Sequence, residues 1–463
     1  MSATQTQTQT TPTETGSLSI TELRPLPSKD PEAMPVDEAP ASAEIVRSES
    51  TTTPILKLVV AGYSFFCAGV NDGTLGPLIP YILSSFGIGT GEIAIIYAVT
   101  FAGWLLAALT NPFMITHLTL GQLLAVGALL QLLAHALRPW GPLPLFCAAF
   151  LFQAAGMGFQ DAHSNSFVSG LRNVPHRWLG FIHACYALGL FVGPLIATAV
   201  ATTGSGGKEG KGGKGVEGWR RVYFVLIGIC VLNVTGVAVA FRDTLWSRLR
   251  HGGCDNSGGG GAKKRNREAV KGMARILKTR MFWLLSLFYF FTLGAGMTAG
   301  GWVVEFLTTV RGGDLSSIGY VPTGMYGGML AGRMLLAEPT FRYGEQRMVL
   351  IYSALCVVLQ LVFWLQPNIV GSAVALSFIG FFTGPFFATG MSVASKLFTR
   401  EDQPAALGLI FVIAQAGGAI FPSVTGLIAT RAGVAVLQPI VLALFVAGGI
   451  SWWLVPRVPQ RDE

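Results

Sequence analysis

Charged residues are scarce in this sequence. Asp, Glu, Lys and Arg make up only 12% of its 463 residues, about half of the ~25% that is usual in soluble globular proteins. A soluble chain of this size would have too few charges to cover its surface, because charged side chains are the ones that stay exposed. The composition therefore excludes an ordinary soluble enzyme and a nucleic-acid-binding protein.

Cysteine is scarce as well. There are six cysteines, five of them in apolar runs and the sixth, Cys254, in a glycine-rich stretch. No Cys-x-x-Cys pair and no Cys/His spacing typical of a metal site occurs, so we interpret the cysteines as small buried apolar side chains. The sequence therefore predicts no disulfide scaffold, no metal and no cofactor. It also has no phosphate-binding loop, which argues against a process driven by ATP.

Apolar residues, in contrast, are abundant. They make up 51% of the chain, its mean hydropathy is +0.54, and they form runs long enough to cross ~30 Å of hydrocarbon as a helix. Strands of a membrane barrel would be about half as long and would alternate in polarity. We therefore predict an all-α integral membrane protein with twelve spans, at residues 55–83, 91–115, 118–137, 142–170, 178–203, 219–241, 281–309, 316–337, 347–365, 369–395, 403–430 and 434–455.

The spans predict a division of the chain into two halves. Residues 1–54 are rich in Thr, Ser and Pro and are predicted to be a disordered cytoplasmic tail. Six spans form a bundle over residues 55–241, and six more form a second bundle over residues 281–455. A basic cytoplasmic linker, residues 242–280, joins the bundles, and residues 456–463 form a short cytoplasmic tail.

The distribution of basic residues predicts the orientation in the membrane. Eleven lysines and arginines lie between residues 242 and 280, and loops rich in these residues stay in the cytoplasm. The Lys/Gly stretch at 204–218, on the other side, opposes this bias. Residues 263–280 are interpreted as a basic amphipathic segment that binds anionic lipid. A solvated linker without lipid contact is the alternative.

The two halves repeat one another. Gly180, Gly189 and Pro194 in span five recur at an offset of 228 as Gly408, Gly417 and Pro422 in span eleven. Further matches relate spans one and seven, and two and eight, at an offset of 225. Because six spans separate the copies, both enter the membrane from the same side. Two pseudo-symmetric bundles of this kind can rock about a site between them, which is the basis of alternating access.

These features resemble the major facilitator superfamily of transporters over roughly residues 55–455. The segment Gly189–Pro194 is similar to its antiporter signature Gly-x-x-x-Gly-Pro, which favours export, although Ala197 and Thr198 replace later glycines. Of the charged loop that the superfamily has after span two, only Gly121 remains. The equivalent loop after span eight keeps more, so the resemblance implies gating residues at Arg333, Arg342, Glu345 and Arg347.

Three further motifs, at residues 69–73, 160–165 and 178–183, resemble a fungal branch of the superfamily that is named after a yeast bypass-of-stop-codon protein. They are more distantly similar to fucose-permease-like carriers. Some members of the fungal branch accompany genes for secondary metabolites, which implies export of organic products. The likeness to sugar carriers implies uptake instead.

Polar residues inside the spans are the candidate site. A charge at mid-bilayer costs roughly 3 kcal/mol or more, so it should face a partner or a cavity. Asp161 and Asn165 are four residues apart and share one helix face, and a buried carboxylate is readily neutralised by a proton. Each candidate has a structural alternative, as a helix cap or an interhelical hydrogen bond. The candidates for binding substrate or protons are Asp72, Asp161, Asn71, Asn165, His163, His183, Glu305 and Gln415.

The sequence therefore predicts a monomeric secondary transporter that moves a small organic molecule by alternating access. We expect proton coupling and efflux, with the plasma membrane as location and a vacuolar or other internal membrane as the alternative. A proton-coupled sugar or nutrient uptake symporter and a receptor without flux remain alternatives. An enzyme is not expected, because Asp161 and His163 lie on different helix faces and no catalytic group is evident.

Overall fold

The computed structural model of the protein describes residues 54–171, 175–205, 218–246, 273–399 and 402–456. All of them belong to one unit, which spans residues 41–463. Every secondary-structure element within the described ranges is helical. The predicted all-α class is therefore confirmed for the part of the chain that the structure describes.

Several predicted segments lie outside the described residues. These are the N-terminal tail up to residue 53, most of the Lys/Gly stretch, the linker between residues 247 and 272, and the C-terminal tail from residue 457. The proposed lipid contact at 263–280 is described only from residue 273 onward.

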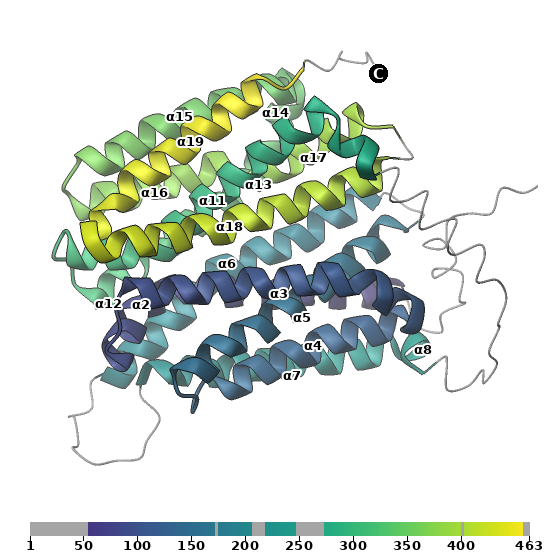
Figure 1. Cartoon of the computed structure of the whole chain (residues 1–463), viewed down its shortest axis with the longest axis horizontal. Helices are drawn as coiled ribbons and strands as arrows, with labels where there is room; N and C mark the ends of the chain where they lie inside the picture. Colours follow the sequence, from purple (N-terminus) through teal and green to yellow (C-terminus); the bar gives the residue numbers. More distant parts are fainter. Residues whose placement is uncertain (1–53, 172–174, 206–217, 247–272, 400–401, 457–463) are drawn as a thin grey trace, which may run out of the picture. The chain divides into compact units, whose positions relative to one another are not determined.

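The described part of the first half of the chain forms six long helices (Figure 1). A 3-10 turn, η1 (Gly218–Arg221), precedes the sixth, and a short helix, α8 (Arg242–Leu245), follows it. The long helices are α2 (Pro54–Phe86), α3 (Thr90–His117), α4 (Leu120–Leu137), α5 (Leu143–Ser169), α6 (Pro175–Ser205) and α7 (Val222–Ala240).

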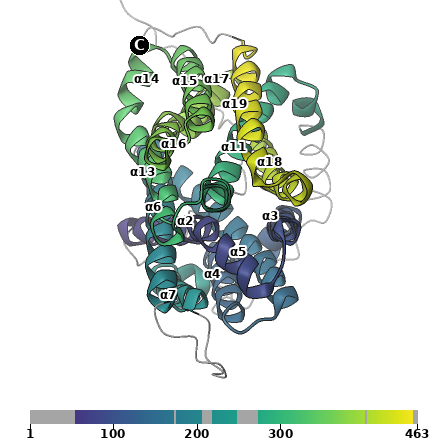
Figure 2. The ribbon, with the colours of Figure 1, turned by 90° about the vertical axis from the view of Figure 1, so that its left-hand side faces the viewer.

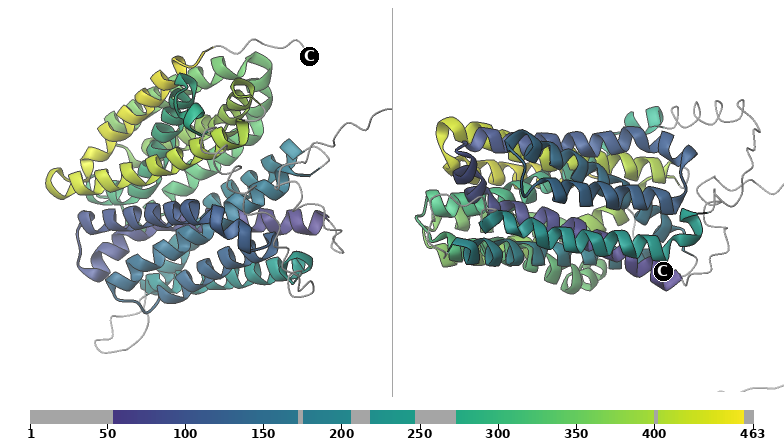
Figure 3. Two further views of the ribbon diagram at one scale, coloured as in Figure 1. Left: turned by 45° about the vertical axis from the view of Figure 1, so that its right-hand side comes forward. Right: turned by 90° about the horizontal axis from the view of Figure 1, so that it is seen from below.

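The second half repeats this arrangement with more breaks, and its helices form a separate layer beside those of the first half (Figures 2 and 3). Its elements are α11 (Arg280–Thr309), α12 (Leu315–Ile318), α13 (Val321–Leu335), α14 (Ala337–Tyr343), α15 (Glu345–Leu365), α16 (Ile369–Thr383), α17 (Phe386–Leu397), α18 (Gln403–Ala432), η2 (Val434–Val436) and α19 (Leu437–Trp453).

Eleven segments of the described chain are long and apolar enough to cross a membrane. The twelfth predicted span, 316–337, is divided into α12 and the 15-residue α13. The break precedes Pro322, which lies in the first turn of α13, where its missing N–H costs no hydrogen bond. The predicted span 369–395 is likewise divided into α16 and α17, at Gly384 and Pro385.

Helix ends follow from local sequence. The side chain of Asn368 accepts hydrogen bonds from the backbone N–H groups of Val370 (2.8 Å) and Gly371 (3.2 Å), which caps the start of α16. Gly433, with a φ of 74°, ends α18 in a conformation that other residues rarely adopt.

The internal repeat is expressed in the packing. In the first half α2 packs most extensively against α6, and in the second half α11 packs most extensively against α18. Gly189 of α6 lies directly against the carbonyl oxygen of Phe66 in α2, and Gly417 of α18 lies against that of Phe290 in α11. Small residues let helix backbones approach closely in a membrane, so the repeated glycines set the distance within each pair.

A buried hydrogen-bond network joins four helices of the first bundle. The side-chain oxygen of Gln160 (α5) accepts from Gln131 (α4) at 2.7 Å and from Asn233 (α7) at 3.0 Å. Asn233 in turn accepts from the hydroxyl of Ser64 (α2) at 2.8 Å. Interhelical hydrogen bonds of this kind satisfy polar groups that lipid cannot solvate.

The alternating direction of the helices defines two faces of the molecule. We call the face at which α2 begins and α19 ends the terminal face, and the opposite face, at which α2 ends, the far face. The terminal face lies to the right in Figure 1. The sequence predicts that it is cytoplasmic.

The close packing of α11 and α18 gives a first prediction. Gly417→Ala should destabilise the protein by about 1–3 kcal/mol, because the added methyl group would overlap the Phe290 carbonyl. Gly228→Ala, where nothing lies within 4 Å, serves as the control and should be neutral. Thermal unfolding of the purified variants in detergent measures both. Equal melting temperatures for the two variants would contradict the assigned helix contact.

Candidate functional site

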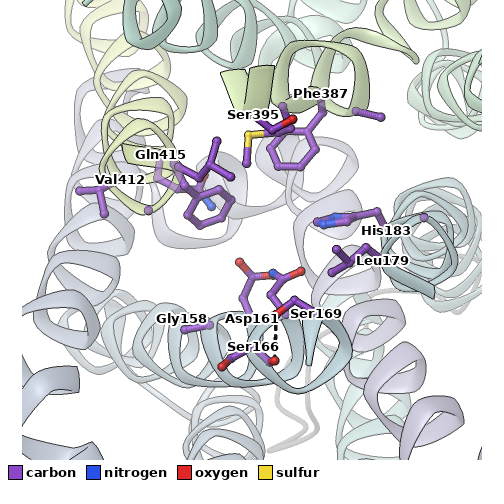
Figure 4. A pocket seen from close by; sticks show the side chains of 18 of the residues that line it. Gly158, Asp161, Ser166, Ser169, Leu179, His183, Phe387, Ser395, Val412 and Gln415 are labelled. Atoms are coloured by element: carbon purple, nitrogen blue, oxygen red, sulfur yellow. Dashed lines mark hydrogen bonds between the residues drawn. The ribbon is translucent and has the colours of Figure 1, made fainter. Parts of the chain in front are cut away.

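A cavity of about 1920 Å³ lies between the two bundles. The first bundle lines it with α3, α5 and α6, and the second with α13, α17 and α18 (Figure 4). The lining extends from Gly158 and Gln415, near the middle of their helices, to Gly170 and Ala337, at helix ends on the terminal face. The cavity therefore opens at the terminal face, and its size exceeds the ~300–1,000 Å³ typical of small-molecule sites.

A smaller chamber of about 160 Å³ continues the cavity toward the centre of the molecule. Both spaces are lined by Trp104, Asp161, His183 and Arg333. Asp72 borders the chamber but not the larger cavity. Most of the other side chains around the chamber are aromatic rings or methionines: Phe65, Tyr186, Tyr289, Tyr326, Phe386, Phe387, Phe411, Phe445, Met157, Met297, Met325 and Met329.

Contacts between the bundles close the far face. Gly76 of α2 lies directly against the carbonyl oxygen of Gly300 in α11, so that position 76 has no room for a side chain. Nearby, the hydroxyl of Ser423 in α18 donates to the carbonyl oxygen of Ala94 in α3 at 3.1 Å. The cavity is thus open at one face and sealed at the other.

Asp161 on α5 points into the cavity, across from Phe387 and Gln415 (Figure 4). Within the described part of the chain its one hydrogen bond comes from the side-chain amide of Asn165, at a long 3.4 Å. Among the described residues no basic side chain forms an ion pair with it. Asp161 is therefore a carboxylate without a balancing charge.

Asp72 on α2 has a different environment. Its carboxylate accepts hydrogen bonds from the hydroxyl of Tyr186 at 2.8 Å and from the side-chain amide of Asn71 at 3.1 Å. The oxygen of Asn71 accepts from Arg138 at 3.2 Å. Arg138 is only 1% exposed, and its guanidinium lies 3.8 Å from the ring centroid of Phe150.

A chain of hydrogen bonds therefore links the chamber, through Tyr186, Asp72 and Asn71, to a buried arginine. Arg138 directly follows the last residue of α4, but its side chain turns back into the bundle. The positive charge of Arg138 can balance a negative charge on Asp72, whereas Asp161 has no such neighbour.

Three more of the predicted residues line the cavity: Asn165, His183 and Gln415. The ring of His183 lies between those of Phe65 and Phe387, at centroid distances of 5.2 and 5.0 Å. Arg333 also lines the cavity and donates to the backbone oxygen of His183 at 2.8 Å, which joins α13 to α6.

The other predicted site residues lie away from the cavity lining. His163 bonds through its Nε2 to Asn111 at 2.8 Å, as an interhelical contact between α5 and α3. Asn71 is buried next to Asp72. Glu305, 7% exposed, does not border the cavity or the chamber. No group of three metal-binding side chains occurs in the described part of the chain.

The four predicted gating residues do not form one latch. Glu345 accepts a hydrogen bond from Ser392 and pairs with Lys396, both at 2.7 Å, and so joins the start of α15 to α17. Arg342 and Arg347 are exposed at the terminal face. Arg333 contacts the opposite bundle instead, as described above.

The corresponding region of the first bundle uses other groups. The hydroxyl of Thr119, at the start of α4, donates to the carbonyl oxygen of Thr244 in α8 at 2.6 Å. Gly121 packs against the same short helix. Lys57 of α2 forms a buried ion pair with Asp243 of α8 at 2.6 Å. These contacts lie around the loop after span two, where the superfamily has charged residues.

Sequence analysis missed Arg138 and most of the aromatic lining. A spacing signal for part of it exists, because His183, Tyr186 and Leu190 lie on one face of α6 and all border the chamber. No such signal marks Arg138, whose partner Asn71 is 67 residues away in the chain.

Two parallel six-helix bundles around a cavity that is open at one face define the class of membrane transporter folds built from parallel repeats. The sequence also matches the family model described as Major Facilitator Superfamily, over residues 62–380 and 293–463. The chain belongs to this family. It is therefore an integral membrane protein of a transporter family and not an enzyme.

Relatives in sequence and structure agree with this assignment. The chain is 24% identical over 440 residues to "Bypass of stop codon protein 6" of Saccharomyces cerevisiae (strain ATCC 204508 / S288c), covering 89% of this chain and 85% of that protein. The resemblance to that fungal branch is thus confirmed.

Solved structures of other transporters share the fold. A bacterial homolog of the human lysosomal transporter Spinster, in an inward-facing and unoccupied conformation, has a TM-score of 0.64 at 12% identity, covering 87% of this chain and 97% of that one. The transporter FucP in the outward conformation has a TM-score of 0.60 at 15% identity, covering 87% and 99%. A point mutant of the nucleoside transporter NupG has a TM-score of 0.64 at 14% identity, covering 86% and 98%.

The buried arginine gives a second prediction. Arg138→Gln should destabilise the protein by about 3–5 kcal/mol, because it leaves the Asp72 carboxylate without a balancing charge. The double variant Arg138→Gln with Asp72→Asn should recover part of this loss. Thermal unfolding in detergent, arranged as a double-mutant cycle, measures the coupling.

Arg431→Gln, at an exposed position on the far face, is the control for loss of an arginine and should leave the melting temperature unchanged. If the double variant is no more stable than Arg138→Gln, the two charges are not coupled.

Proposed function

We propose that this protein is a secondary transporter that moves a small organic molecule by alternating access and couples this movement to protons. One observation carries the proposal: among the described residues, Asp161 is a carboxylate without a balancing charge on the wall of a cavity between the two bundles. Protonation neutralises such a group. If Asp161 binds a proton while the cavity is open at one face and releases it while the cavity is open at the other, the movement of the proton is coupled to that of the substrate.

We propose efflux because of the antiporter-like segment Gly189–Pro194; an opening at one face alone belongs to the cycle of an importer as well as of an exporter. The cavity opens at the terminal face, which the sequence predicts to be cytoplasmic, so a substrate would enter from the cytoplasm. Rocking of the bundles would separate Gly76 from Gly300 at the far face and narrow the cavity at the terminal face. A proton bound to Asp161 from outside would then drive the return.

The closing of the terminal face assigns a role to charged residues there. We infer that Arg333, which already contacts α6, and the pair of Glu345 with Lys396 at the end of α17 come closer to the first bundle in that state. Arg342 and Arg347 are exposed on the same face and would act as surface charges.

The surroundings also need assignment. We propose a monomer in the plasma membrane, with the basic segment 263–280 against anionic lipid. Within its described part, Arg275 pairs with Asp402 at 3.7 Å and Ile276 is buried against the second bundle. The described end of this segment thus lies next to the start of α18.

Uptake of a sugar or another nutrient is the second candidate. It is favoured by the fold shared with a protein described as a "Fucose:proton symporter", which has a TM-score of 0.60 at 15% identity, covering 87% of this chain and 99% of that one. A receptor without flux is the third candidate, and only a flux measurement separates it from a transporter.

A third prediction tests the coupling. Membrane vesicles from cells that express the protein, under an imposed proton gradient, should accumulate at least one compound from a metabolite extract of those cells, measured by mass spectrometry. Asp161→Asn should reduce this accumulation to that of vesicles without the protein, because the amide cannot carry the proton.

Asp314→Asn, an exposed carboxyl at the far face, is the matched control and should transport normally. Reversal of the gradient shows the direction of transport. Unchanged accumulation with Asp161→Asn would remove this residue from the coupling step.

A fourth prediction tests the closed layer. Gly76→Leu should keep α2 and α11 apart, because the backbone of Gly300 occupies the space of the new side chain. Spin labels at Glu92 and Arg431, exposed at the far-face ends of α3 and α18, should show a longer distance in this variant, and transport should be lost. Gly228→Leu, with nothing within 4 Å, is the control. The same label distance in both variants would contradict the proposed seal.

A further inference from the structure

The groups around the chamber differ in how much of their bonding capacity is already used. The hydroxyl of Tyr186 donates to Asp72, and that of Tyr289 donates to the carbonyl oxygen of Phe387 at 2.7 Å. Gln160 and Ser64 are held in the network of the first bundle. These four polar side chains therefore offer little to a ligand.

Asp161 and Gln415 differ from them. Gln415 has no hydrogen bond within the described residues, and Asp161 has only the long one from Asn165. Both border the cavity as well as the chamber. A sugar needs a partner for each of its many hydroxyl groups, since an unpaired buried hydroxyl is costly. Among the described residues, Trp104, His183 and Tyr326 also border the chamber without a side-chain hydrogen bond, so the polar groups available there are few beside its apolar lining.

A row of aromatic side chains lines the chamber together with Asp161. The rings of Trp104 and Phe411 lie 5.9 Å apart, those of Phe411 and Phe387 6.4 Å, and those of Phe387 and Tyr289 5.7 Å. The four residues come from α3, α18, α17 and α11, so both bundles contribute. The faces of aromatic rings attract cations, and the attraction grows when water is excluded.

We propose that the chamber binds an organic cation with a bulky apolar or aromatic body, whose positive charge lies at Asp161. The methionines around the chamber, such as Met157 and Met329, suit varied apolar shapes because their side chains are flexible. This inference rests on the proposed function for the site itself, and it extends it to the class of substrate. Because substrate and proton compete for one carboxylate, the transport would be an exchange of one for the other.

Other charged and titratable groups also face the cavity or the chamber, and the test must distinguish them from Asp161. The helices α3, α17 and α18 contribute none to the lining. Arg333 is the one lining residue with a fixed positive charge, and its guanidinium already donates to His183. The full set besides Asp161 is Asp72 on α2, His183 and Tyr186 on α6, Tyr289 on α11, and Tyr326 and Arg333 on α13.

Three probes of similar shape and different charge test the proposal: tetraphenylphosphonium, which is a permanent cation, tetraphenylborate, which is an anion, and neutral triphenylphosphine oxide. Binding to the purified protein in nanodiscs is measured by equilibrium dialysis. We expect the cation to bind, and Asp161→Asn to weaken its binding at least tenfold. Asp161→Glu keeps the carboxylate and should retain binding, and Asp314→Asn is the matched surface control.

The pH dependence assigns the competing group. Because the charge of the phosphonium is fixed, its affinity should fall on acidification only through a group of the protein. We expect this fall in the unchanged protein and in Asp161→Glu, and no fall in Asp161→Asn. A fall that persists in Asp161→Asn would assign the competition to another group and overturn the proposal.

Two further outcomes would also overturn it. Tighter binding of the borate than of the phosphonium would indicate an anion site at Arg333, and displacement of the phosphonium by fucose would indicate a sugar site. The assay needs no flux, so it is independent of the proposed function. Proton-coupled transport without phosphonium binding would contradict the substrate class alone, and phosphonium binding without any flux would contradict transport alone.

Discussion

The structure depends on one constraint: a charge inside the hydrocarbon layer must have a partner or a watery cavity. Asp72 meets this constraint through Asn71 and the buried Arg138. Asp161 meets it by facing the cavity, without any charged partner. Two acids that look equivalent in the sequence therefore differ in what surrounds them. The first is held by the bundle, and the second is available to whatever enters between the bundles.

The same constraint explains two arginines of the far face, Arg220 and Arg311, which oppose the usual excess of basic residues on the cytoplasmic side. Arg220 donates to the carbonyl oxygens of Pro139 (3.2 Å) and Gly141 (3.1 Å), in the connection after α4. Arg311 donates to the carbonyl oxygen of Phe363 near the end of α15, at 2.6 Å. Carbonyl groups at helix ends attract positive charge. These arginines stabilise the fold by hydrogen bonds to backbone carbonyl oxygens. A simple count of basic residues on the two faces therefore mixes structural arginines with those that set the orientation in the membrane.

The fold could largely be predicted from the sequence, because it depends on local or repeating patterns. These are the length of the spans, the even number of spans between the repeats, and the glycines at 189 and 417. The candidate site could be predicted in part. Asp161 and Asn165 share a helix face and line the cavity together. Glu305 looked similar by residue type, yet it lies away from the cavity, because residue type does not tell which way a helix is turned. The contact between Arg138 and Asn71 depends on how α2 and α4 pack, which no local pattern specifies.

The distribution of bonds indicates where the molecule can move. Within each half, glycine contacts bring α2 against α6 and α11 against α18, and the Gln160 network joins four helices of the first bundle. The contacts between the halves include one such glycine contact, of Gly76 with the carbonyl oxygen of Gly300, and others that differ from those within a half. They include the hydrogen bond from Ser423 to Ala94 at the far face and that from Arg333 to His183 beside the cavity. In each of these hydrogen bonds a side chain donates to a backbone carbonyl oxygen. Such a bond can break without unfolding a helix. Rocking of two firm bundles would therefore disturb few bonds, and it would change the surroundings of Asp161 while leaving Asp72 and Arg138 together.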